Sequence, residues 1–163
     1  MFLIRVFSTK TLLLALVLAG IAISGTGAQT SDPMVGTWKL NVAKSTTTFK
    51  SGTTVVESAG DGLKTTVDIV ASDGTPYHWT WTAKYDGKDN PVIGPSPYGS
   101  GSHEIALTRV DPRTIKIVTK HDGKVTITQT LAVSVDGKTR ITTTNGKDAK
   151  GRPVQSTAVH ERQ

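Results

Sequence analysis

KVTITQTLAV, residues Lys124–Val133, is a stretch in which two kinds of side chain alternate. Val125 and every second residue from there to Val133 fall on one face of an extended chain, and the intervening threonines fall on the other. A period of two is typical of a strand with one buried face, and β-branched residues suit a pleated surface. The stretch therefore predicts a β-strand of an antiparallel sheet.

Asp-Gly and Asn-Gly pairs divide the rest of the chain into stretches of the same kind. Such pairs favour the positive backbone dihedrals of two-residue hairpin turns. They occur at Asp61-Gly62, Asp73-Gly74, Asp86-Gly87, Asp122-Gly123, Asp136-Gly137 and Asn145-Gly146. Short strands that begin about every 10 to 14 residues and are joined by tight turns predict an antiparallel meander.

A meander with one apolar face has two free edges, which invite aggregation. Closing the sheet into a cylinder removes both edges. A two-sheet sandwich would also bury the apolar faces, but it needs longer crossing connections. We therefore predict an all-β fold, a single antiparallel up-and-down β-barrel of about 8 to 10 strands, with the sandwich as the alternative.

The first 28 residues have the pattern of a secretory signal peptide. Met1–Lys10 carries two basic residues and no acid, and Thr11–Ile23 is an apolar run. At about 1.5 Å per residue this run is too short for the roughly 30 Å core of a membrane. We predict cleavage after Ala28, which leaves one domain, residues 29–163, that has no membrane span and is periplasmic or secreted.

The composition limits the partners of this domain. There is no cysteine, and the net charge of +6 for the whole chain falls to about +4 without the two basic residues of the leader. The basic residues are spread along the chain, whereas nucleic-acid sites usually show a clustered patch. We expect a monomer that binds no nucleic acid.

DPMVGTWKLN, Asp32–Asn41, resembles the first strand of the calycins, the superfamily of lipocalins and fatty-acid-binding proteins. STAVHERQ, Ser156–Gln163, resembles the last strand of the fatty-acid-binding proteins. The resemblance implies that Gly36 and Trp38 lie at the bottom of a barrel. It also implies that Arg162 packs over the indole as a cation–π contact that ties the first strand to the last.

The segment from GTWKLN to AKYDGKDNPVIG also resembles a group of exported bacterial proteins to which no function is assigned. Two features depart from the fatty-acid-binding proteins. Those proteins insert a helical lid between their first two strands, whereas Val42–Gly52 is expected to be extended. They also hold a carboxylate with an arginine-x-tyrosine in the last strand, where Ala158 and His160 stand here.

The stretch PYHWTWTAKYDG, Pro76–Gly87, predicts a strand with an aromatic face. Alternation places Tyr77, Trp79, Trp81 and Tyr85 together. Side chains of this size each bury about 150 to 250 Å². Three interpretations remain open, namely a wall of a filled barrel, a stacking wall for a ligand, and an exposed interface.

Lys88–Ser102 is rich in proline and glycine and predicts a long loop. We consider it as a gate at the barrel mouth that Tyr98 closes, or as a bent edge segment followed by a connection. His160 is expected on the inner wall. The candidate ligand-binding residues are Tyr77, Trp79, Trp81, Tyr85, Tyr98 and His160.

The sequence shows little sign of a catalytic or metal-binding motif. The four histidines lack metal-ligand spacing, and Ser96 lacks the sequence of a nucleophile elbow. We therefore expect no enzyme, no metal and no cofactor. The prediction is a protein that binds a small apolar or amphipathic ligand, and the alternative is a filled barrel that acts through its surface as an inhibitor, adaptor or envelope-stress protein.

Overall fold

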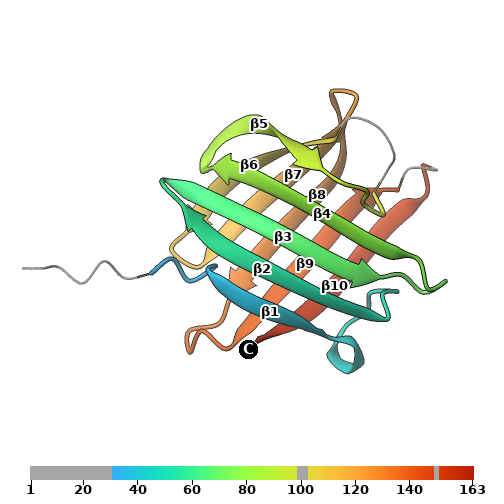
Figure 1. Ribbon diagram of the computed structural model, residues 1–163, viewed down its shortest axis with the longest axis horizontal. Coiled ribbons are helices and arrows are strands. Elements are labelled where there is room, and N and C mark those ends of the chain that lie inside the picture. The colour runs from blue at the N-terminus through green and yellow to red at the C-terminus, as the bar shows by residue number, and fades with distance from the viewer. Residues whose placement is uncertain (1–30, 99–102, 149–150) are drawn as a thin grey trace, which may run out of the picture. The chain divides into compact units, whose positions relative to one another are not determined.

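The computed structural model describes residues 31–98, 103–148 and 151–163, so the predicted signal peptide lies outside the described residues. Ser31–Gln163 forms one compact unit, a closed antiparallel barrel of ten strands (Figure 1). The strands are β1 (Gly36–Asn41), β2 (Ser51–Ala59), β3 (Gly62–Val70), β4 (Pro76–Lys84), β5 (Asp86–Ile93), β6 (His103–Asp111), β7 (Thr114–His121), β8 (Lys124–Val133), β9 (Thr139–Lys147) and β10 (Pro153–Arg162). The predicted up-and-down barrel is confirmed, and the sandwich is excluded.

Each strand pairs with the next one along the chain, and β1 closes the cylinder by pairing with β10. In this last ladder Trp38 lies opposite Arg162, and Leu40 lies opposite His160. The ladder between β4 and β5 is short, with bridges only at Thr80↔Ile93 and Trp81↔Val92. Near the hairpin, β5 pairs with β6 instead.

The predicted positions of two turns and one loop are wrong. Asp86-Gly87 lies inside β5 rather than at a hairpin turn, because the chain turns at Tyr85. A loop from Lys88 is wrong, because Asp86–Ile93 is a strand held by β6, for example through Asn90↔Ile105. This strand agrees with the alternative of a bent segment followed by a connection, of which residues 99–102 lie outside the described residues.

Asn145-Gly146 lies inside β9 rather than at a hairpin. Gly146 has a φ of +154°, and a Cβ there would overlap the carbonyl oxygen of Thr126 on β8. Glycine is needed here for the close approach of two strands rather than for a turn.

Between β1 and β2 the chain forms one 3-10 turn, η1 (Val42–Lys44), in place of the expected fully extended segment. The Asn41 side chain caps this turn by accepting a hydrogen bond from the backbone N–H of Lys44, at 3.1 Å. Within the described residues no helix is long and apolar enough to cross a membrane.

The hydrophobic core includes Trp38 and the large buried side chains that cluster with it. Trp38 and Leu107 are fully buried there, together with Met34, Leu63 and Ile115. The indole Nε1–H of Trp38 donates a hydrogen bond of 2.9 Å to the carbonyl oxygen of Met34. The segment that precedes β1 therefore packs onto this core.

Candidate functional site

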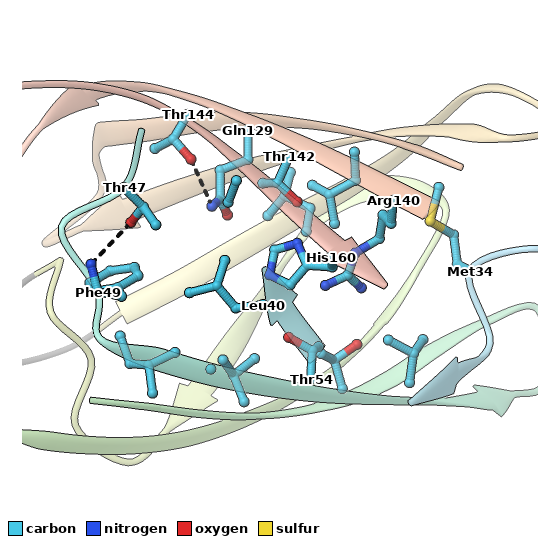
Figure 2. A pocket seen from close by; sticks show the side chains of 18 of the residues that line it. Met34, Leu40, Thr47, Phe49, Thr54, Gln129, Arg140, Thr142, Thr144 and His160 are labelled. Atoms are coloured by element: carbon cyan, nitrogen blue, oxygen red, sulfur yellow. Dashed lines mark hydrogen bonds between the residues drawn. The ribbon is translucent and has the colours of Figure 1, made fainter. Parts of the chain in front are cut away.

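A cavity of about 110 Å³ lies inside the barrel (Figure 2). Its apolar wall includes Leu63, Val67, Trp79, Trp81, Ile117 and Leu131. Its polar wall includes Thr54, Thr65, Gln129, Arg140, Thr142, Thr144 and His160. The interior is therefore amphipathic, with most of its polar groups supplied by the neighbouring strands β8, β9 and β10.

Phe49 and Thr47 lie at one end of the cavity, and Arg140 and Met34 lie toward the other (Figure 2). The backbone N–H of Phe49 donates to the Thr47 hydroxyl at 3.4 Å. Tyr98 also lines the cavity and meets Trp79 edge to face, with ring centroids 6.5 Å apart. Burial raises the pKa of the Tyr98 hydroxyl to about 12, so this phenol is neutral.

Arg140 is the most unusual residue of the site, because its side chain is only 3% exposed and has no acidic partner among the described residues. It extends from β9 into the cavity and lies opposite His160 of β10 in the ladder. Burial lowers the pKa of the Arg140 guanidinium to about 9, and the nearby Arg162 adds to this shift. Arg140 therefore stays charged at neutral pH.

Several polar groups of the cavity wall have no hydrogen-bond partner. Arg140 Nε, His160 Nδ1, Thr65 Oγ1 and Thr142 Oγ1 are buried and make no hydrogen bond among the described residues. Burial, and next the charge of Arg140, lower the pKa of His160 to about 3, so its imidazole is neutral. Four unsatisfied polar groups thus line one small cavity.

The barrel-closure residues lie together as the sequence predicts. The Arg162 guanidinium carbon lies 4.2 Å from the centroid of the Trp38 ring. Its nitrogens donate to the carbonyl oxygens of Gly137, Val35 and Pro33. Gly36 has a φ of +139° and lies against this guanidinium, where a Cβ would clash.

The predicted ligand-binding residues separate into two groups. Trp79, Trp81, Tyr98 and His160 line the cavity, whereas Tyr77 and Tyr85 do not. Tyr77 lines an open groove at the barrel rim. The placement of Tyr85 in the ligand wall is corrected, because β4 ends at Lys84 and the chain turns there.

Tyr85 instead belongs to a cluster that fastens the segment before β1. Its hydroxyl donates a hydrogen bond of 2.5 Å to Asp32, and Asp32 also forms an ion pair with Arg109. The Arg109 guanidinium lies 3.9 Å from the Tyr85 ring centroid. This arrangement is structural, since each polar group has a partner.

The rim groove measures about 590 Å³ and lies over the ends of β1, β2, β3 and β4. Leu40, Gly52 and Ile69 line both the groove and the interior cavity. The groove also contains the exposed pair of His78 and Asp68, whose Nδ1 and Oδ1 atoms lie 2.6 Å apart.

Sequence reasoning missed Arg140 and Phe49. Arginine is usually placed on the solvent side of an alternating strand, and Phe49 belongs to a segment with no periodic pattern. Among the described residues no group of three or more histidine, aspartate or glutamate side chains is arranged to hold a metal ion.

No protein-family model and no curated protein matches this chain.

Proposed function

We propose that this protein is an exported binding protein for a small amphipathic molecule. The supporting observation is the interior cavity, in which Trp79 and Trp81 on β4 contribute to an apolar wall and unpartnered groups on β3, β9 and β10 supply polarity. A concave, largely apolar pocket with a few convergent polar groups is typical of a small-molecule site. Buried polar groups without partners are rare in folded proteins, so a cluster of them calls for an occupant.

The cavity volume limits the ligand. Small-molecule pockets usually measure about 300 to 1,000 Å³, and this one measures about 110 Å³. It has room for a compact molecule, or for one end of a longer molecule whose remainder lies in the rim groove. The small volume also favours the second candidate, a barrel that acts through its surface.

Binding of benzamide, a compact neutral molecule, tests the proposal. Binding is measured by ligand-observed NMR and by the change in tryptophan emission. Ala158→Leu places a larger side chain in the cavity that Ala158 lines, and should weaken binding by about tenfold or more. Val159→Leu is the matched control, because Val159 is the next residue on β10 and faces away from the cavity.

A second measurement is native mass spectrometry of the protein purified from its own host. A retained small molecule would support the binding function. If the wild type neither binds benzamide saturably nor retains a molecule, the surface-acting barrel becomes the better account.

A further inference from the structure

Arg140 is a buried cation without a counter-ion inside the barrel. Only 3% of its side chain is exposed. No aspartate or glutamate occurs among the described residues that line the cavity, and the Nε–H of Arg140 has no acceptor among them. Removing a charge from water without pairing it is costly, so an unpaired buried arginine weakens the fold.

A purely structural role does not account for this residue. The Arg140 guanidinium carbon lies 5.1 Å from the centroid of the Trp38 ring, but Arg162 lies nearer, at 4.2 Å. Arg162 also donates to three backbone carbonyl oxygens, which compensate its charge. Barrel closure is thus provided by Arg162, and a second cation beside it adds like-charge repulsion.

Several polar groups that line the cavity with Arg140 can donate hydrogen bonds. Thr142 shares the inward face of β9, and His160 lies opposite Arg140 on β10. The Thr65 hydroxyl, on β3, also lacks a partner. Ordered water could satisfy the hydroxyl groups, but neutral water does not balance a cation. An oxyanion would satisfy the hydroxyl groups and also balance the cation, because it accepts several hydrogen bonds and carries a negative charge.

The size of the cavity and its single uncompensated cation define the anion further. One planar guanidinium matches one carboxylate, to which it can donate two parallel hydrogen bonds. An apolar cavity of about 150 Å³ is known to hold benzene, so about 110 Å³ holds a carboxylate and only part of a ring. The rest of the ring would extend toward the rim groove, which shares Leu40, Gly52 and Ile69 with the cavity. Trp79 and Trp81 line the same cavity and supply an apolar surface for the part of the ring that lies inside it.

We infer that Arg140 anchors a carboxylate-binding subsite and that the ligand is a compact monoanionic carboxylic acid, whose apolar part contacts Trp79 and Trp81. This inference rests on the proposed binding function and adds the charge and chemical class of the ligand. His160 and Thr142 serve as additional donors to the carboxylate.

The test compares benzoate with benzamide on the same protein at neutral pH and low ionic strength. The two molecules have the same ring and a similar shape, but only benzoate carries a charge. Wild-type protein should bind benzoate at least about tenfold more tightly, because charge-assisted hydrogen bonds are the stronger ones. Inorganic phosphate is the competitor that distinguishes a general anion site, and it should not displace benzoate.

Arg140→Met removes the charge and keeps the length of the side chain. The preference for benzoate should then disappear while benzamide binding persists. Arg113→Met is the matched control, because Arg113 is exposed in the turn between β6 and β7, so this variant changes the net charge equally. It should keep the wild-type preference.

A readout on the wild type covers the case in which Arg140→Met does not fold. The Arg140 side-chain Nε–H resonance should shift when benzoate is added and stay unchanged with benzamide. Equal binding of the two molecules, a retained preference in Arg140→Met, or displacement by phosphate would each overturn the carboxylate site and leave the binding function standing. Failure of both molecules to bind would overturn the carboxylate site. It would overturn the binding function as well only if native mass spectrometry also finds no retained molecule.

Discussion

Two arginines inside one barrel show how their surroundings decide what a residue contributes. Arg162 has three carbonyl acceptors and lies over Trp38, so it joins the ends of the chain. Arg140 lies on the inner wall of β9 and has neither an acid nor a carbonyl acceptor among the described residues. The same side chain is thus compensated in one place and uncompensated in the other.

We predict opposite effects of the same substitution at these two positions. Arg140→Met should raise the free energy of unfolding by about 1 to 3 kcal/mol, because an uncompensated charge leaves the interior. Arg162→Met should lower it by about 2 to 4 kcal/mol, because three partly buried carbonyl groups lose their donor. Urea denaturation measures both. Equal destabilisation by the two substitutions would show that Arg140 is a structural residue.

At the scale of the element, the short segment between β1 and β2 contributes to one end of the cavity. Phe49 is half-buried and lines one end of the cavity, although no helix pair is present in this segment. The segment is fastened to the last strand, since the backbone N–H of Thr46 donates to the carbonyl oxygen of Thr157 at 2.8 Å. Phe49 is therefore a second candidate for the covering role that the sequence suggests for Tyr98.

We predict that Phe49→Ala will speed the binding and release of benzamide severalfold and change the free energy of unfolding by about 1 kcal/mol or less, because surface segments make few core contacts. Stopped-flow tryptophan fluorescence measures the rates. Thr48→Ala is the control, because Thr48 is exposed and does not line the cavity. Unchanged rates in Phe49→Ala would place the entrance elsewhere on the barrel.

Strand β8 shows where alternation alone misplaces a residue. The sequence groups Val125 with Ile127, yet Val125 is 60% exposed while Ile127 is fully buried. The ladder between β7 and β8 shifts register between Thr119 and Lys120. The period of two is broken by this irregularity, which carries no signal in the sequence of β8.

At the scale of the whole molecule, the buried histidines make stability depend on pH. Burial and the charge of Arg140 lower the pKa of His160 to about 3, and burial together with His121 lowers the pKa of His103. The unfolded chain takes up these protons below about pH 6.5, whereas folded His160 does not until about pH 3. The unfolded state therefore binds more protons in this window, and stability is lost as the pH falls.

We predict that the free energy of unfolding will decrease between pH 6.5 and about pH 4, by up to about 1.4 kcal/mol per pH unit for each such histidine. His160→Gln should make this slope shallower, and His78→Gln should not, because His78 lies on the exposed outer face. Chemical denaturation at a series of pH values measures the slope. A slope that His160→Gln leaves unchanged would mean that His160 is protonated inside the folded barrel.

The sequence by itself determines the strand rhythm and the up-and-down order, because these depend on local signals, namely alternation and turn residues. The contact between Trp38 and Arg162 is implied by the resemblance of the two chain ends to calycins, and it is present in the structure. Four of the six candidate cavity residues, Trp79, Trp81, Tyr98 and His160, also line the cavity. The other two occur where a strand ends or reaches the rim, and strand limits are not encoded by alternation.

Only the tertiary structure decides which face of β9 is inside. Alternation indicates that Arg140 and Thr142 share one face and Ile141 the other, and apolar character alone would place Ile141 inside. The structure has the reverse, with Ile141 45% exposed and Arg140 buried. The pairing of β9 with its two neighbours fixes which of its residues point inward, since Arg140 pairs with inward-facing Val133 on β8 and with His160 on β10. Neighbouring residues across a sheet point to the same side, so the closed barrel holds the charge inside against the preference of the residue itself.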